Sequence, residues 1–386
     1  MMQSPISPSG PDAARHPNLA GSRWIIKIGS AMLTPDGVHL DLEAMNHWCH
    51  QIDAMIGAGK QVILVSSGAI AVGMARVGWK VRPHELPLLQ AAAAVGQMGL
   101  IQAYERAFMS LNRTTAQVLL TNLDLADRRR YLNSRSTMRA LLNLGVVPIV
   151  NENDTVVNEE IRFGDNDILA AMVANLLDAH VLVILTDQAG FFDRNPRLYP
   201  DARLISEADA CDATLLQMAS PEGNALGRGG MRSKVMAAAR AALSGTITII
   251  AHGREPDVLT RLTQGESIGT LLYPCNKDVL AARKRWLMGH MRPRGCVIID
   301  EGAVRKLRKD GASLLPIGIV KIQGAFHRAD VVECLDTQGK LVARGLSNYS
   351  AGEIHRICGR HSANIESILG YVSEAEVIHR DNMVLV

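Results

Sequence analysis

Short apolar segments alternate with longer, helix-like segments over most of this chain, and this alternation is its strongest constraint on fold. The strand-like segments occupy residues 24–28, 61–65, 146–150, 181–185 and 246–251. Helical spacing is found at residues 42–58, 86–110, 131–144, 167–177 and 233–244. Strands without a polar face need cover on both sides, which parallel strands joined by helices provide. The sequence therefore predicts an α/β fold, a three-layer α/β/α sandwich with a mostly parallel central sheet.

The pattern changes near residues 276–294, where basic residues gather around Pro293. Short strand candidates follow at residues 296–300, 317–323, 330–335 and 341–346, separated by glycines and turn residues. Such spacing is typical of a small β-rich domain. We therefore expect an extension over residues 1–22, a first domain over 23–280, a linker over 281–294 and a second domain over 295–378.

Composition bounds the class of protein. Of 386 residues, 47% are apolar and 20% charged, as in a soluble protein with a large core, and a net charge of +3 gives no global argument for nucleic acid. No apolar run reaches the roughly 18 residues of a membrane helix. Residues 1–22 are rich in Pro, Ser, Ala and Gly and lack the apolar core of a signal peptide. We expect a cytoplasmic protein with a disordered N-terminal extension.

The cysteines are dispersed and form no C-x-x-C pair, which argues against a zinc site. We expect all six to be buried, reduced thiols. They are Cys49, Cys211, Cys275, Cys296, Cys334 and Cys358.

Polar loops follow the predicted strands. Gly29, Ser67, Asn151–Asp154 and Asp187 each come directly after one. In an open parallel sheet these loops share the carboxyl edge, where ligands bind. We therefore expect the functional site at this edge.

Two amide- and acid-rich segments mark that site, Asn151-Glu152-Asn153-Asp154 and Gly164-Asp165-Asn166-Asp167. Capping a helix needs one such residue, so the surplus requires another explanation. It could hold the α-amino group of a substrate, orient catalytic lysines, or do both. Binding of a divalent metal is a further alternative, although the spacing does not fit a calcium loop.

Two lysines stand in positions suited to phosphate. Lys27 lies inside an apolar strand, where an ammonium is costly unless paired, although an edge-strand lysine facing solvent is the alternative. Lys234 ends the segment Gly229-Gly230-Met231-Arg232-Ser233-Lys234, whose glycines and following helix could meet a polyphosphate. Ser67 could bind an anion or merely cap a helix, and Thr186–Gly190 could hold a nucleotide or be an ordinary turn. Together these features favour phosphoryl transfer, without the G-x-x-x-x-G-K-[ST] loop of P-loop enzymes.

Taken in order, these segments resemble the amino acid kinase family, in particular the branch that phosphorylates the side-chain carboxylate of L-glutamate in the first step of proline synthesis. The resemblance covers about residues 23–382. The tail, including Ser313-Leu314-Leu315-Pro316, is similar to the PUA domain that bacterial members carry. The glycine-rich loop departs from the family pattern at Arg228 and Arg232, which puts the affinity for ATP in question rather than the reaction.

The resemblance implies a role for each segment. Lys27, Lys234 and Asp167 would be catalytic, and Ser67, Asp154 and Asn166 would bind glutamate. ATP would bind with Mg²⁺ bridging its phosphates, and no protein side chain is assigned to the metal. The residues assigned to ATP are Lys27, Thr186, Asp187, Arg228, Gly229, Gly230, Met231, Arg232, Ser233 and Lys234.

The resemblance also implies partners. They are L-glutamate as substrate, proline as feedback inhibitor, further copies of the chain in a dimer or tetramer, and the next enzyme of the pathway. A structural or regulatory role of the PUA-like domain is favoured over RNA binding, and no membrane is expected. Two alternatives stay open: a kinase of another small acidic substrate on the same fold, and an RNA-binding protein.

Overall fold

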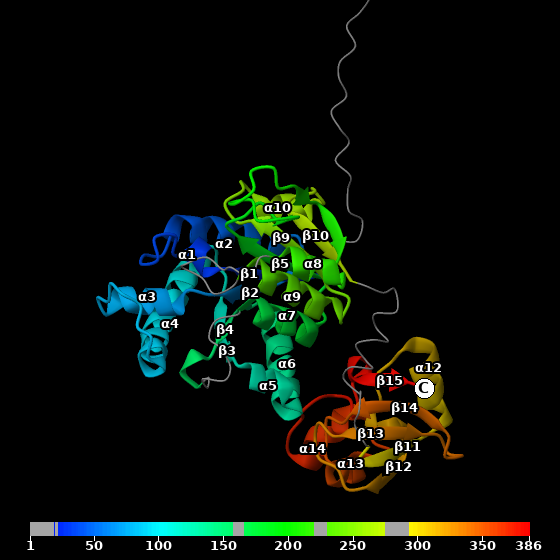
Figure 1. The fold of residues 1–386 in the computed structure, drawn as a ribbon. Coiled ribbons are helices and arrows are strands. Elements are labelled where there is room, and N and C mark those ends of the chain that lie inside the picture. Colours follow the sequence, from blue (N-terminus) through cyan, green and yellow to red (C-terminus); the bar gives the residue numbers. More distant parts are fainter. Residues whose placement is uncertain (1–18, 20–21, 157–165, 220–229, 275–292) are drawn as a thin grey trace, which may run out of the picture. The chain divides into compact units, whose positions relative to one another are not determined.

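The computed structural model describes residue 19 and residues 22–156, 166–219, 230–274 and 293–386 (Figure 1). These residues form two compact units. The first holds the chain up to Asn122 and resumes at Arg135, ending at Cys275. The second holds Leu123–Ser134 and the chain from Asn276 onward. The predicted N-terminal extension lies outside the described residues except for residues 19 and 22.

An eight-stranded sheet forms the middle of the first unit, in the order β3-β4-β2-β1-β5-β9-β10-β8. All its pairings are parallel except that of β9 with β10, which confirms the mostly parallel sheet. Its strands are β1 (Arg23–Ile28), β2 (Gln61–Ser66), β3 (Thr115–Leu120), β4 (Val147–Glu152), β5 (Val181–Thr186), β8 (Glu207–Asp209), β9 (Ile247–His252) and β10 (Thr270–Tyr273). A separate hairpin joins β6 (Phe191–Phe192) to β7 (Leu204–Ile205).

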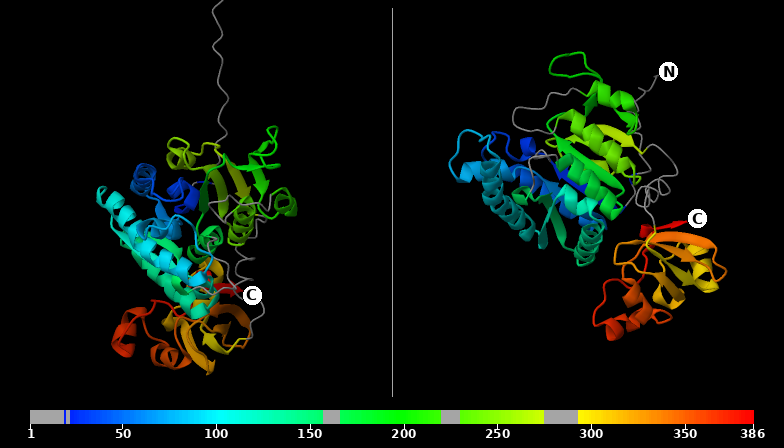
Figure 2. Two further views of the ribbon diagram at one scale, coloured as in Figure 1. Left: turned by 60° about the vertical axis from the view of Figure 1, so that its left-hand side comes forward. Right: turned by 60° about the horizontal axis from the view of Figure 1, so that its bottom comes forward.

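Helices cover both faces of this sheet (Figure 2), as the apolar strands require. Consecutive strand residues point to opposite faces, so Ile249 packs into one core and Ile250 into another. The first core includes α2 (Leu42–Gly57), α4 (Leu86–Met109) and α10 (Val258–Thr263). The second includes α8 (Ala213–Met218) and α9 (Met231–Ala242). The remaining helices of the unit are α1 (Ser30–Leu33), α3 (Ala69–Arg76) and α7 (Asn166–Leu177), while α5 (Asn122–Ala126) and α6 (Arg128–Asn143) connect β3 to β4.

Two glycines bring α3 and α4 into backbone contact. A Cβ added to Gly73 would lie 1.7 Å from the carbonyl oxygen of Ala92, and one added to Gly96 would lie 1.8 Å from that of Ala69. Only glycine permits this approach. Because α3 begins directly after Ser67 and Gly68, the contact fixes where the loop after β2 lies.

The helix α4 is long and apolar enough to cross a membrane by length and composition alone. Within the unit it has a different role. Its buried residues Leu100, Tyr104 and Phe108 pack into the core shared with α2.

The expectation of six buried, reduced cysteines is only partly right. Cys49 and Cys334 are buried free thiols, and Cys296 and Cys358 are free and half-exposed. Cys211 is exposed and disulfide-bonded, which is the correction. The dispersed spacing of the cysteines gave no sign of this bond. It did not reveal that Cys211 follows β8, a short strand that joins the sheet by pairing with β10. Cys275 lies outside the described residues.

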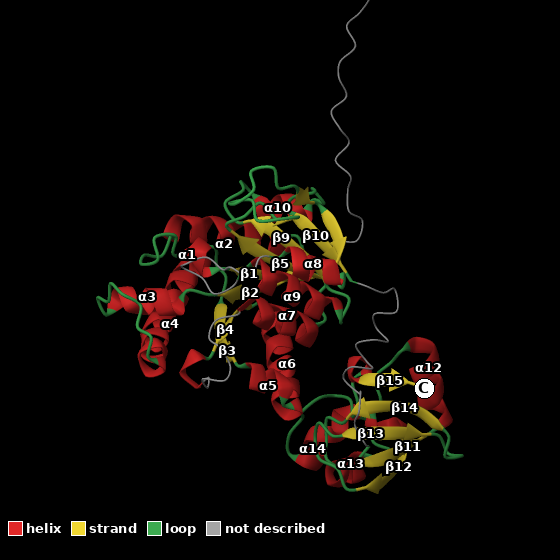
Figure 3. Cartoon of the chain, viewed as in Figure 1, coloured by secondary structure: helices red, strands yellow, loops and turns green. Residues whose placement is uncertain are grey.

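The second unit is β-rich, as predicted (Figure 3). Its five-stranded sheet has the order β12-β11-β13-β14-β15 and is antiparallel except between β11 and β13. The strands are β11 (Gly295–Ile299), β12 (Ile319–Gly324), β13 (Val331–Leu335), β14 (Leu341–Leu346) and β15 (Met383–Leu385), with helices α12 (Glu301–Asp310), α13 (Ala351–Ile357) and α14 (Ile365–Leu369). Strand β12 begins two residues later than expected, because Pro316–Gly318 form a 3-10 turn.

Candidate active site

The loops after β1, β2, β4 and β5 meet at one edge of the sheet. These four strands are parallel neighbours in the order β4-β2-β1-β5, so their carboxyl ends coincide. The prediction that Gly29, Ser67, Asn151–Asp154 and Asp187 share an edge is therefore confirmed.

A buried carboxylate between two lysines forms one end of the site. Lys27 Nζ lies 2.6 Å from Asp167 Oδ1, and Lys234 Nζ lies 3.0 Å from Asp167 Oδ2. The side chains are almost inaccessible, with residue exposures of 5%, 0% and 6% for Lys27, Asp167 and Lys234. Burial opposes ionisation of Asp167, but the charges of Lys234 and Lys27 outweigh it and hold the pKa of the carboxyl well below its usual range. The cluster thus places two lysine ammonium groups on a single buried carboxylate.

Three elements deliver these side chains. Lys27 comes from β1, a central strand, which rules out the solvent-facing edge lysine. Asp167 is in the first turn of α7, and Lys234 is in the first turn of α9, whose N-cap is Gly230. Ser233 Oγ lies 2.9 Å from Asp167 Oδ2 and 3.0 Å from the carbonyl oxygen of Gly230, so it links the start of α9 to the carboxylate.

An uncharged network of amides forms the other end. Asn166 Nδ2 lies 2.9 Å from the carbonyl oxygen of Ser66, 3.0 Å from Ser67 Oγ and 2.9 Å from Asn151 Oδ1. Asn151 Nδ2 in turn donates to Gln97 Oε1 at 2.6 Å. The oxygen Oδ1 of Asn166 is buried and has no hydrogen-bond partner in the described part of the chain. This end therefore offers an acceptor rather than a charge.

The residue at the N-cap of α3 is Gly68, with φ of 94°, and it makes no side-chain cap. Ser67 is therefore not the helix cap that was its alternative interpretation. Its hydroxyl instead meets Asn166.

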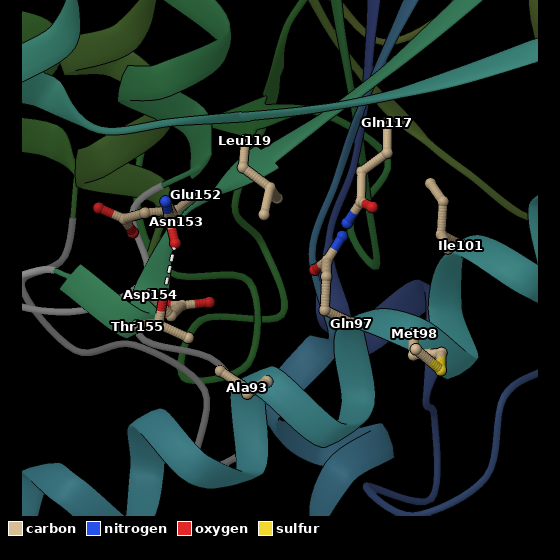
Figure 4. Close-up of a pocket in the computed structure, with 11 residues that line it drawn as sticks. Ala93, Gln97, Met98, Ile101, Gln117, Leu119, Glu152, Asn153, Asp154 and Thr155 are labelled. Carbon is tan, nitrogen blue, oxygen red and sulfur yellow. Dashed lines mark hydrogen bonds between the residues drawn. The ribbon is translucent and has the colours of Figure 1, made fainter.

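Asp154 lies beside the amide network and lines a cavity of about 280 Å³ (Figure 4). It begins the 3-10 turn after β4, and only 9% of its surface is exposed. Burial, and then the nearby charge of Glu152, raise the pKa of Asp154 to about 7, although Arg82 acts in the opposite direction. An ammonium group at this carboxylate would favour its ionised form.

The end of β5 places Thr186 and Asp187 at the same edge of the sheet. Thr186 is buried, and its hydroxyl donates to Asp187 Oδ1 at 3.2 Å. Asp187 Oδ2 accepts from Arg197 Nη2 at 2.9 Å. Asp187 is half-exposed, unlike the lysine–aspartate cluster, as a loop that admits a ligand from solvent requires.

The structure thus brings together most of the predicted site residues. Ser233 and Lys234 contact Asp167, and Gly230 accepts a hydrogen bond from Ser233. Met231 is half-exposed, and the exposed Arg232 lies 3.4 Å from the carbonyl oxygen of Leu216. Arg228, Gly229, Gly164 and Asp165 lie outside the described residues. Among the described residues there is no cluster of three or more His, Cys, Asp or Glu side chains that could hold a metal.

Sequence reasoning missed two residues of the network. Asn151 stands in a segment that was singled out, but no role was assigned to it. Gln97 lies in the alanine-rich helix α4, and nothing in its sequence distinguishes it from neighbouring surface residues.

Comparison with known proteins shows two matching families. The amino acid kinase family model matches residues 22–251, and the PUA domain model matches residues 295–369. Curated relatives named glutamate 5-kinase align along nearly the whole chain. The protein of Thioalkalivibrio sulfidiphilus is 60% identical over 94% of this chain and 96% of its own length. The protein of Stutzerimonas stutzeri is 58% identical over 94% of this chain and 98% of its own length. The protein of Nitrosococcus oceani is 56% identical over 95% of this chain and 97% of its own length.

Proposed function

The chain belongs to the amino acid kinase family and, within it, to the glutamate 5-kinases with a C-terminal PUA domain, and from that premise we propose how its residues perform the reaction. The reaction transfers the γ-phosphoryl group of ATP to the side-chain carboxylate of L-glutamate. Its product is L-glutamyl 5-phosphate, and it is the first step of proline biosynthesis.

The acceptor in this reaction needs no strong general base. A carboxylate is already ionised at neutral pH and attacks without losing a proton. The protein has to align donor and acceptor and to stabilise the charge on the transferring group.

Lys27 and Lys234 supply that charge. Both contact the carboxylate of Asp167, and two ammonium groups gathered at one buried point favour the binding of an anion. The N-terminus of α9, whose N-cap residue is Gly230, adds the backbone N–H groups of its first turn beside Lys234. Mg²⁺ bound to ATP would neutralise part of the phosphate charge.

Thr186 and Asp187 are proposed to contact the nucleotide at the end of β5, together with the glycine-rich loop of residues 228–234. Asp167 is proposed to orient the ammonium groups of Lys27 and Lys234 toward the transferring phosphoryl group. Ser233 holds the carboxylate in that orientation through Oδ2.

Ser67, Asp154 and Asn166 are proposed to bind glutamate. The unpaired Oδ1 of Asn166 and the carboxylate of Asp154 are acceptors suited to the α-ammonium group of the substrate. Nδ2 of Asn166 keeps Ser67 in place. A ligand with a charged amine at one end and a carboxylate at the other fits acceptors at one end of the site and lysines at the other.

The observation that carries the proposal is the single carboxylate of Asp167 held between two buried lysines. Its test is ATP turnover with L-glutamate and Mg²⁺, with the acyl phosphate trapped by hydroxylamine. Wild type should form the hydroxamate, and Lys234→Ala should lose about 10²–10³-fold in kcat. The exposed Lys321→Ala in β12 is the matched control and should retain full activity. A folded wild type that makes no hydroxamate would refute the glutamate assignment.

Several expected partners belong to the same proposal. We infer a cytoplasmic homo-oligomer, dimeric or tetrameric, that is inhibited by proline at a site overlapping that of glutamate. The reactivity of glutamyl 5-phosphate favours association with the next enzyme of the pathway. The PUA-like unit is proposed as a structural or regulatory part, with the boundaries of its domain at residues 295–378.

A further inference from the structure

A chain of three side-chain amides runs from α4 to the proposed glutamate site. Gln97 accepts a hydrogen bond from Asn151, and Asn151 accepts one from Asn166. The two distances are 2.6 Å and 2.9 Å. Asn151 is 2% exposed and Asn166 is 6% exposed, so solvent is not a ready substitute for either bond.

Backbone groups fix the direction of this chain. The carbonyl oxygen of Ser66 can only accept, so the atom of Asn166 that faces it is the nitrogen Nδ2. The backbone N–H of Glu152 can only donate, so the atom of Asn151 that it meets, at 2.9 Å, is the oxygen Oδ1. Asn151 must therefore present Nδ2 to α4, and an acceptor is required there.

Gln97 is that acceptor. Figure 4 shows its side chain rising from α4 at the rim of the cavity that Asp154 also lines, with its amide nitrogen directed toward Gln117. Gln97 follows Gly96, the residue at which α4 touches the backbone of α3. The close packing of the two helices thus fixes the position of Gln97 relative to Asn151.

We propose that Gln97 is a positioning residue for the amino-acid substrate. It acts through Asn151 and Asn166, which it holds in the orientation that leaves Oδ1 of Asn166 open as an acceptor. This inference rests on the proposed role of Asn166 in binding glutamate. Its role is indirect, through the two asparagines, and it has no part in binding the nucleotide.

The test compares Gln97→Met with Gln97→Glu. Methionine preserves length but removes the acceptor, and leaves a buried N–H of Asn151 unsatisfied. We expect the KM for glutamate to rise about tenfold, the effect of one lost buried hydrogen bond. The KM for ATP and the kcat at saturating glutamate should change less than about twofold, because neither lysine depends on this chain. Gln97→Glu retains an acceptor and should recover most of the glutamate affinity.

Gln102→Met is the matched control. It makes the same chemical change on the same helix, at a half-buried glutamine for which the described structure shows no hydrogen bond, and it should leave all three constants unchanged. Thermal unfolding of each variant checks that it is folded.

The results separate this inference from the proposed function. An unchanged KM for glutamate in Gln97→Met, with wild type active, would refute the positioning role alone. Equal rises in both KM values with a loss of thermal stability would show a merely structural residue and would refute it as well. Failure of wild type to phosphorylate glutamate would instead refute the function.

Discussion

The two ends of the site are built on different principles, although they meet at consecutive residues. Asp167 belongs to a cluster of buried charges with Lys27 and Lys234. Its neighbour Asn166 belongs to a network of neutral amides with Asn151 and Gln97. Both residues lie in the first turn of α7, where successive side chains diverge by about 100° around the helix axis.

The contrast follows from what each end must do. Transferring a phosphoryl group requires charge, and buried charge is strong because little water screens it. Recognising an amino acid requires direction, and an amide that is bonded at its nitrogen has one defined orientation for its oxygen. The charged end should therefore determine kcat, and the amide end should determine the KM for glutamate.

Asp167→Asn is the strongest test of that division. A neutral amide cannot balance two buried ammonium groups, and breaking a buried ion pair costs about 3–5 kcal/mol. We expect kcat to fall by about 10³-fold, with a smaller change in the KM for glutamate. Steady-state hydroxamate kinetics measure both. Asp310→Asn, which removes an exposed pair with Lys306, should have no effect on either constant.

Gly96→Ala should damage the amide end through packing. Its methyl group would overlap the backbone of Ala69 at the start of α3, and overpacking costs about 1–3 kcal/mol. We expect a lower melting temperature and a higher KM for glutamate, since the displaced segment carries Ser67. Gly57→Ala, where an added Cβ meets nothing within 4 Å, should be neutral or slightly stabilising. Equal melting temperatures for the two variants would contradict the close contact.

The affinity for glutamate should depend on pH through Asp154. The pKa of its carboxyl is raised to about 7 by burial and by Glu152, so the residue is neutral at low pH and cannot attract an ammonium group. As pH rises from 6 to 8 the carboxyl ionises, and the KM for glutamate should fall by about tenfold at saturating ATP. Asp154→Asn should raise the KM at pH 8 and remove this dependence. A wild-type KM that is constant over this range would exclude the proposed contact.

Arg197→Ala should have the smallest effect. The ion pair of Arg197 with Asp187 is half-exposed, and such pairs are worth at most about 1 kcal/mol. We expect the KM for ATP to change by less than about fivefold and the KM for glutamate to stay the same. Loss of kcat comparable to that of Asp167→Asn would show that the nucleotide loop also belongs to the charged end.

The charged end was largely predictable from the sequence, and the amide end only partly. Lys27 stands out because an ammonium inside an apolar strand requires a partner, and a parallel sheet places the ends of its strands together. Gln97 could not be predicted in this way. Its position depends on the depth at which α3 and α4 pack, which Gly73 and Gly96 determine jointly and which no local pattern in α4 expresses.

The two edge strands of the sheet, β3 and β8, could not be predicted from local sequence pattern either. Strands β1, β2, β4, β5 and β9 are apolar runs and were recognised. Strand β3 is half-exposed and β8 is short and polar, so neither produces such a run. Both are strands because they pair with β4 and β10, which is a property of the assembled sheet.

The distribution of the charged cluster along the chain has a consequence for synthesis on the ribosome. Lys27 emerges early, Asp167 follows, and Lys234 comes last. It lies on α9, which is followed in the described part of the first unit only by β9, α10 and β10. A chain that has not yet placed α9 has only the pair of Lys27 and Asp167. The two-lysine arrangement that we propose to bind the phosphates is complete only when the last of the three segments has docked. A partly synthesised first unit should therefore not bind nucleotide, because its phosphate site is still incomplete.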